Sequence, residues 1–405
     1  MSLGAELPGF QFPVGARSAA GGGLTYEPVA DEASWDRLAT EWDDAAVRAQ
    51  AFYLSHVWLR RWWATYGQGR LAAGAVREGG RIVALAPFRR LRRRFWGLPT
   101  RTVANLFNAH ACRSDVALLE REAEALDLVL DALDREPWDV VLLREIPERS
   151  RFLRLLPAAA RARGWAMHTR WSLDSPCIPI TGDWEGFFAN LPARFRKQLR
   201  NKRNRLLSSG AKVEIACVAG AEAIEAVVPE VMAVAGRSWS GERGTSIASP
   251  PHRGFYENVF RDFARRDQLR IWTLRVGGVL AAFEVHVVWG RTTAAVKACY
   301  DPAFAHLSVG SILEAQVTEQ LFRSGEFDAC DLLGKDDFHK TRWTENTERH
   351  VEVFLFNGRP LSRLLRSLEF GLRPSLSAVR KGSQRLLRAA FSRASPAERP
   401  PHPES

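Results

Sequence analysis

The stretch that decides the fold is Leu269–Lys340, which reads LRIWTLRVGGVLAAFEVHVVWGRTTAAVKACYDPAFAHLSVGSILEAQVTEQLFRSGEFDACDLLGKDDFHK. Two apolar runs meet at Gly277-Gly278, a dipeptide that suits a tight hairpin turn because glycine readily adopts positive φ at both central positions. A second turn at Gly290 precedes another strand-like run, Thr292–Tyr300. We therefore expect three consecutive antiparallel strands.

A small-residue run, Ser308–Ser311, separates these strands from a helix-forming segment that ends near Phe322. A buried-looking strand over residues 327–333 follows. The first turn of a helix leaves backbone N–H groups unpaired, and the helix dipole adds positive potential there. This order of elements predicts a phosphate or pyrophosphate site at the start of the helix, beside the end of a strand.

The same order of elements occurs earlier in the chain. Residues 71–91 form a hairpin pattern around Gly79-Gly80, and a strand, a helix over residues 120–135 and the run PWDVVLLREIPE follow. That run aligns with EFDACDLLGKDD, which puts Asp331 of the second copy opposite Leu142 of the first. Matched hairpins followed by matched helix–strand pairs indicate an internal duplication.

The two copies differ where an anion would bind. The first copy has NLFNAHACRSDVALLE before its helix, and this segment contains no glycine that would let a phosphate approach the backbone closely. We therefore expect the second copy to be the working unit and the first to be a scaffold or an acceptor-binding partner.

Composition limits the function classes. The 405 residues are 46% hydrophobic and 25% charged, with a net charge of +11. A basic surface favours an anionic partner, although arginine-rich coding alone would give the same charge. Five cysteines without a CxxC pair favour free thiols in a reducing compartment. The sequence has neither a long apolar span nor a secretory signal, and we expect a cytoplasmic protein without a metal site.

The chain divides into four predicted parts. Residues 1–23 form a Gly- and Pro-rich flexible leader, residues 24–180 the first unit, residues 181–358 the second unit, and residues 359–405 a basic tail. Amphipathic basic helices in that tail would allow peripheral contact with an acidic membrane, and a solvated or packed terminal helix is the alternative.

The predicted helix Ala193–Ser208 carries basic residues almost all round, among them Arg196 and Arg200. Such a helix either presents a solvated face or contacts a partner that carries phosphate groups.

These features resemble a known family. The order of hairpin, strand, Gly-containing loop, helix and strand is similar to the GNAT acyltransferase core. A closer resemblance, to the CelD/BcsL-type acetyltransferases, lies in three segments: FEVHVVWGRTTAAVKACYDPAFAHLSVGSIL, DLLGKDDFHKTRW and LPARFRKQLRNKRNRL. These are related to the FemAB aminoacyltransferases, which have two tandem GNAT-like units. The resemblance implies an α/β (α+β) fold with two such units, each a mostly antiparallel mixed sheet flanked by helices, and acetyl-CoA or another acyl-CoA as co-substrate.

The candidate site residues fall into three groups. Acyl transfer to an amine needs a base, oxyanion stabilisation and alignment. Polar residues in apolar strands are costly unless they have a role or a partner. We expect catalytic roles for Asp331, Glu284 and Tyr300, cofactor contacts from Lys297, Ser308, Val309, Gly310, Ser311, Arg196 and Arg200, and acceptor contacts from His339 and Trp239. Residues 335–343 match the lysine–tryptophan element of the family, and the resemblance therefore implies a catalytic role for Lys340 and an acceptor contact for Trp343. A backbone N–H within Lys297–Tyr300 is the expected oxyanion donor. Packing of Tyr300 and a structural salt bridge at Asp331 or Glu284 are the alternatives.

Three functions therefore compete. The first is an N-acyltransferase that uses acyl-CoA and a small-molecule or saccharide acceptor. The second is a FemAB-like transferase that takes an aminoacyl group from tRNA. The third is a basic protein that binds nucleic acid or a membrane surface without catalysis.

Overall fold

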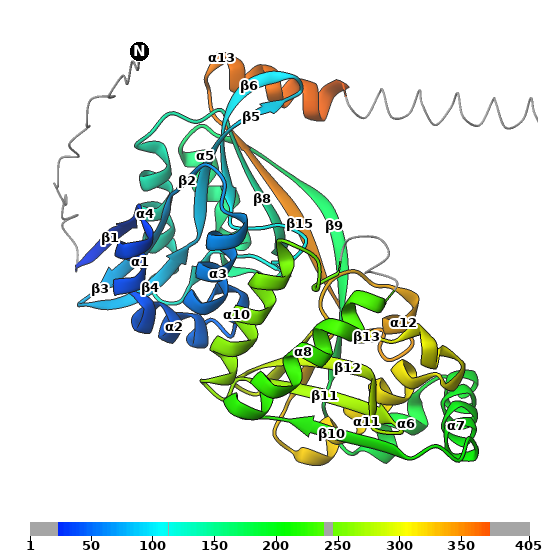
Figure 1. Ribbon diagram of the computed structural model, residues 1–405. Helices are drawn as coiled ribbons and strands as arrows, with labels where there is room; N and C mark the ends of the chain where they lie inside the picture. The colour runs from blue at the N-terminus through cyan, green and yellow to red at the C-terminus, as the bar shows by residue number, and fades with distance from the viewer. Residues whose placement is uncertain (1–22, 112, 239–245, 373–405) are drawn as a thin grey trace, which may run out of the picture.

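The computed structural model describes residues 23–111, 113–238 and 246–372, and Figure 1 shows them as two α/β halves joined by long strands. The predicted leader up to Gly22, Trp239 and the tail from residue 373 onward lie outside the described residues.

The second half has the predicted order. Strands β10 (Val213–Val218), β11 (Leu269–Val276), β12 (Val279–Trp289) and β13 (Thr292–Tyr300) pair antiparallel in sequence. The turn glycines Gly277 and Gly278 have φ angles of 59° and 83°, which confirms the hairpin. Helix α11 (Val309–Ser324) then leads to β14 (Ala329–Asp331), which pairs parallel to β13.

The first half repeats this order of elements, but its first hairpin lies in a separate four-stranded sheet and not in the sheet that contains the parallel strand pair. Its elements are β1 (Leu24–Val29), β2 (Arg70–Leu71), β3 (Ala73–Glu78), β4 (Arg81–Ala86), β5 (Phe88–Phe95), β6 (Leu98–Asn105), β7 (Ala117–Leu118), α4 (Glu122–Asp134) and β8 (Val140–Pro147). Strand β6 pairs parallel to β8, with α4 between them in the chain. Ala104 lies opposite Leu142, just as Ala294 lies opposite Asp331. The predicted duplication is confirmed, including the alignment of Asp331 with Leu142.

Two strands connect the halves. Strand β9 (Ala166–Pro179) pairs antiparallel with β14 near its end, while β15 (Thr347–Phe356) pairs with both β9 and β8. The result is an 11-stranded sheet in the order β10-β11-β12-β13-β14-β9-β15-β8-β6-β5-β2. Two separate strand-like runs were predicted over residues 166–180, and they form one strand of 14 residues because β15 and β14 supply consecutive partners along it.

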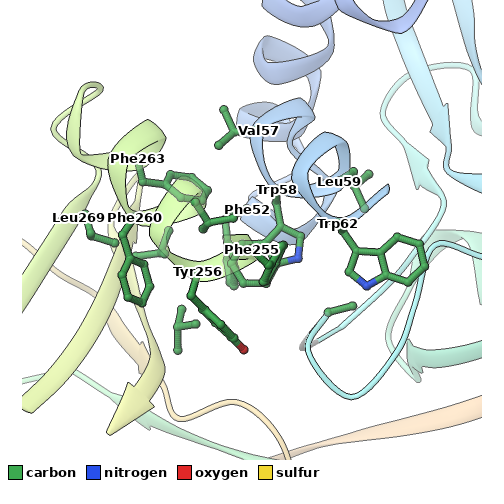
Figure 2. Close-up of a cluster of buried hydrophobic side chains, with 14 of the residues drawn as sticks. Phe52, Val57, Trp58, Leu59, Trp62, Phe255, Tyr256, Phe260, Phe263 and Leu269 are labelled. Atoms are coloured by element: carbon green, nitrogen blue, oxygen red, sulfur yellow. The ribbon is translucent and has the colours of Figure 1, made fainter. Parts of the chain in front are cut away.

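Helices also join the halves. α3 (His56–Tyr66) begins at the predicted cap Ser55, whose hydroxyl accepts a hydrogen bond from the Trp58 N–H. It packs against α10 (His252–Ala264), and Figure 2 shows Trp58 next to Phe255 of α10, with Trp62 farther from that helix. Trp58 is fully buried and makes an edge contact with Phe255 at 5.4 Å between ring centroids. Trp58 therefore has a packing role between the two helices.

The remaining helices surround this frame. They are α1 (Glu32–Arg37), α2 (Ala39–Arg48), α5 (Arg151–Ala162), α6 (Trp184–Asn190), α7 (Ala193–Ser208), α8 (Ala221–Arg237), α12 (Phe338–Thr341) and α13 (Pro360–Arg366). Helices α1 and α2 follow each other directly and are separated only at Leu38. Among the described residues, no helix has the length and apolar character needed to cross a membrane.

We predict that Trp58→Ala lowers the free energy of unfolding by about 3–5 kcal/mol, because it removes a buried aromatic side chain shared by the two halves. Urea denaturation followed by circular dichroism measures the loss. Trp63→Ala, on the same helix but only partly buried, serves as the control and should cost clearly less. Equal losses for the two variants would contradict the packing role of Trp58.

Candidate functional site

The site lies where β13 and β14 part. Their pairing covers only Thr292–Ala294 against Ala329–Asp331, while β13 continues to Tyr300. Within β13, the register against β12 shifts between Ala295 and Lys297, so that Val296 forms a bulge. A bulge increases local twist and leaves backbone groups unpaired. The second half of β13 therefore has a free edge beside β14, and backbone N–H groups along that edge are available as hydrogen-bond donors.

Helix α11 begins next to this edge. Ser308 caps it in a left-handed conformation with φ of 59°, and its first turn contains no acidic residue. A Cβ added at Gly310 would lie 3.1 Å from Cδ1 of Tyr300, so only glycine fits there without moving the ring. The unpaired N–H groups of the first turn and the absence of acidic residues there suit a bound anion.

Cations converge on the start of α11 from α7. The Lys202 ammonium donates a hydrogen bond to Oγ of Ser311 at 2.8 Å. Burial lowers the pKa of Lys202, and the nearby charges of Arg342 and Arg205 lower it further. Lys202 thus contacts the first turn of α11, and the charges of Arg342 and Arg205 act on it from nearby. Together with Gly310 they fit the phosphate groups of a nucleotide-like ligand.

The matching place in the first half is closed. The Asn105 side-chain amide donates to the carbonyl of Arg144 at 2.7 Å and accepts from its N–H at 3.2 Å, which ties the end of β6 to β8. Helix α4 also carries Glu122 and Glu124 in its first turn. Glu122 pairs with Arg151 and Arg154, and Glu124 pairs with Arg121, so ion pairs already occupy the start of this helix.

A buried polar cluster lies on the α11 side of β12. Glu284 is 7% exposed and hydrogen-bonded to Nε2 of His286 at 3.2 Å, and Nδ1 of His286 contacts Oγ1 of Thr293 at 3.1 Å. Glu314 on α11 is half-buried. Burial and then the charge of Glu284 raise the pKa of Glu314 to about 8, against the opposing effects of Trp343, Arg342 and Lys202. A carboxyl group with this pKa can act as a base near neutral pH.

Asp331, predicted as a base, instead pairs with a cation from the other half. Both of its carboxylate oxygens contact the Arg113 guanidinium, with Nη2–Oδ1 at 3.0 Å, and Oδ1 also accepts the Leu333 N–H at 2.9 Å. Arg113 further contacts Oγ of Ser175 at 2.8 Å and Glu348 at 3.4 Å. Asp331 is thus one half of a buried ion pair that links the two halves of the protein. The salt-bridge alternative holds for Asp331, with Arg113 in place of a lysine.

Of the other predicted catalytic residues, Tyr300 is 39% exposed and lies beside Gly310. The Lys340 ammonium donates a hydrogen bond to the Leu333 carbonyl and so holds the loop after β14 in place. Of the predicted acceptor contacts, His339 is exposed on α12, whereas Trp343 is only 2% exposed and packs edge-on against Phe195 at 5.0 Å. Trp343 is therefore part of the core and does not offer a surface to a ligand.

Three predicted cofactor contacts lie away from the start of α11. Lys297 points its ammonium over the ring of Tyr256 on α10, at 5.4 Å, on the opposite face of the sheet from Tyr300. The Arg200 guanidinium lies over Phe188 of α6 at 5.7 Å, and Arg196 falls on the same side of α7 as Arg200. Ser308, Val309, Gly310 and Ser311 do form the start of α11.

Three residues of the site had no individual role predicted from the sequence: Lys202, Glu314 and Arg113. Glu314 had the only available signal, a carboxylate at i+3 from Ser311 on an otherwise apolar stretch of helix. Nothing in the sequence connects Arg113 with Asp331, because they are 218 residues apart and meet only through the exchanged strands.

Comparison with known proteins agrees with this geometry. Residues 193–341 match the family described as acetyltransferase (GNAT) domain. The C-terminal domain (DUF2156) of a putative lysylphosphatidylglycerol synthetase from Agrobacterium fabrum is 13% identical, with a TM-score of 0.51 over 83% of this chain and 95% of that one. FemX is 11% identical, with a TM-score of 0.50 over 74% of this chain and 90% of its own. These structures share the fold. Among curated proteins, none matches the sequence significantly.

We predict that Asp331→Asn and Arg113→Met each lower the free energy of unfolding by about 3–5 kcal/mol, because either change leaves one buried partner of the ion pair alone. The double variant should lose less than the sum of the two. Asp328→Asn, which breaks the exposed pair with Arg291, is the control and should cost under about 1 kcal/mol. Additive losses in a double-mutant cycle would show that the two side chains do not act together.

Proposed function

The chain carries a GNAT acetyltransferase domain over residues 193–341, and on that premise we propose that it moves an acyl group from acyl-CoA to an amine on a small-molecule or saccharide acceptor. The observation that carries the donor assignment is the group of cations around Lys202 at the start of α11, beside the open edge of β13.

The donor would be held by the second half alone. Gly310 allows a phosphate to approach the helix, Lys202 and Ser311 present donors, and Arg342 and Arg205 add positive charge. When bound there, acyl-CoA supplies the activated thioester acyl group. The backbone N–H groups after the Val296 bulge are in place to stabilise negative charge on the thioester carbonyl oxygen.

Glu314 is the proposed general base. Its raised pKa lets it take a proton from the acceptor's ammonium group near neutral pH, directly or through one water. The free amine could then attack the thioester carbonyl, so that the C–N bond forms, the C–S bond breaks and the second amine proton passes to solvent. Glu284 acts through Glu314, because its negative charge is one cause of the raised pKa. Its own hydrogen bond to His286 fixes its position. Tyr300 is the proposed acid for the leaving thiolate, since it is partly exposed beside Gly310.

The first half is proposed to bind no donor, because Asn105 closes the equivalent strands and ion pairs of Glu122 and Glu124 with arginines already occupy the start of α4. Its loop residue Arg113 instead positions β14 through Asp331. The acceptor would then approach from the side on which the two halves meet.

Lys202→Met should weaken binding of acetyl-CoA by about tenfold or more, because it removes a charge-assisted contact to phosphate. Isothermal titration measures the affinity. Lys197→Met is the matched control, since Lys197 is an exposed lysine of the same helix without an ion pair in the described residues, and it should bind normally. If the wild-type chain binds no acetyl-CoA but binds aminoacyl-tRNA, the acyl-CoA donor is wrong and the tRNA-dependent alternative replaces it.

Glu314→Gln should lower kcat by about a hundredfold or more while leaving acetyl-CoA affinity unchanged. In the wild type, kcat should rise with pH up to about 8, where Glu314 loses its proton, and the variant should lack this rise in the pH profile.

The folded state binds the Glu314 proton more tightly than the unfolded chain does, so Glu314 makes stability fall as pH rises from about 4.3 toward 8. The variant should flatten that slope.

Glu319→Gln, on the same helix and paired with Arg323 at the surface, is the control for Glu314. It should leave both the rate and its pH profile unchanged. A Glu314→Gln enzyme that keeps the wild-type pH profile would remove Glu314 from the role of base.

A further inference from the structure

Helix α7 carries more positive charge than the donor site uses. Seven basic side chains lie along its 16 residues, and within the described parts of the chain none of them forms an ion pair with an acidic residue. They are Arg194, Arg196, Lys197, Arg200, Lys202, Arg203 and Arg205. By contrast, Arg151 and Arg154 on α5 both pair with Glu122. The basic residues of α7 therefore differ from those of α5 in having no acidic partners within the described residues.

The charges of α7 point in two directions. Lys202 faces α11 through Ser311. Arg196, Arg200, Arg203 and Leu207 are spaced at i, i+4, i+7 and i+11, which places them in one stripe along another side of the helix. Leu207 is 66% exposed, an unusual position for a leucine within such a basic stripe.

The neighbouring helix α6 adds aromatic surface next to this stripe. Trp184, Phe187 and Phe188 are all half-buried, and the Arg200 guanidinium lies over the Phe188 ring at 5.7 Å. The rings also pack on one another. Phe187 stacks on Phe322 at 4.5 Å between centroids, and Trp184 lies 5.2 Å from Phe188. Phe322 therefore covers one face of Phe187, and Arg200 covers one face of Phe188.

We propose that this surface, formed by Arg196, Arg200, Arg203 and Leu207 of α7 with the aromatic side chains of α6, docks the protein on an acidic lipid bilayer. Arginines without acidic partners attract anionic headgroups, and an exposed leucine beside tryptophan and phenylalanine suits the interfacial region of a membrane. Single-stranded nucleic acid would need open ring faces on which bases stack, and here neighbouring side chains already cover one face of two of these rings. The proposal does not depend on the identity of the donor or acceptor.

Co-sedimentation of the full chain with vesicles tests the proposal. Binding should be strong to phosphatidylcholine vesicles that contain phosphatidylglycerol, weak to pure phosphatidylcholine, and reduced by salt. Arg200→Ser with Arg203→Ser should weaken binding about thirtyfold, because each basic side chain near an acidic leaflet contributes about 1 kcal/mol. Arg92→Ser with Arg161→Ser removes the same charge from exposed positions on the first half and should bind as the wild type does.

Leu207→Glu is a second variant. It adds a negative charge at an exposed position, where the change should not affect folding, and it should reduce binding to acidic vesicles. Circular dichroism checks that each variant is folded. The proposal is overturned if the wild type binds both vesicle types equally, if the α7 and control double variants lose the same affinity, or if the chain binds single-stranded RNA but no acidic vesicle.

Discussion

The exchange of strands between the two halves is the constraint on which the rest of the structure depends. The second half ends its own strands at β14, and the next strand in the sheet is β9, which comes from the first half. In return, β15 lies between β9 and β8 and completes the first half. Since unpaired strand edges are unfavourable, neither half has a complete sheet without the other. The duplicated units are thus held in one fixed relation, with Arg113 and Asp331 paired where β9 meets β14.

Within that frame the two copies have diverged by a few side chains. Both have a parallel strand pair that starts in the same register and a helix that connects the two strands. In the first copy, Asn105 closes the strands and acidic residues occupy the first helical turn. In the second copy, β13 continues beyond its pairing with β14. Gly310 lies in the first turn of the connecting helix, and Lys202 contacts that turn. Local electrostatics and one side-chain hydrogen-bond pattern therefore distinguish an open site from a closed one on the same fold.

The turns, the duplication and the alignment of Asp331 with Leu142 could be predicted from sequence, because glycine turns and apolar periodicity are local signals. Roles that depend on distant partners could not. Asp331 has the features of a buried base until Arg113 is placed beside it. The basic residues of α7 surround the helix, so only the position of α11 selects Lys202 over Arg196 and Arg200. Trp343 looked like a site residue, and its packing on Phe195 places it in the core.

The central claim is that only the second copy holds the acyl donor, at the open edge of β13 and the start of α11. Hydrogen–deuterium exchange with and without acetyl-CoA tests it most directly, because it reports protection of backbone N–H groups in both copies within one experiment. The account predicts slower exchange over residues 296–312 and no change over β6 and the first turn of α4. Protection at β6 and α4, or no protection over residues 296–312 at saturating acetyl-CoA, would contradict it.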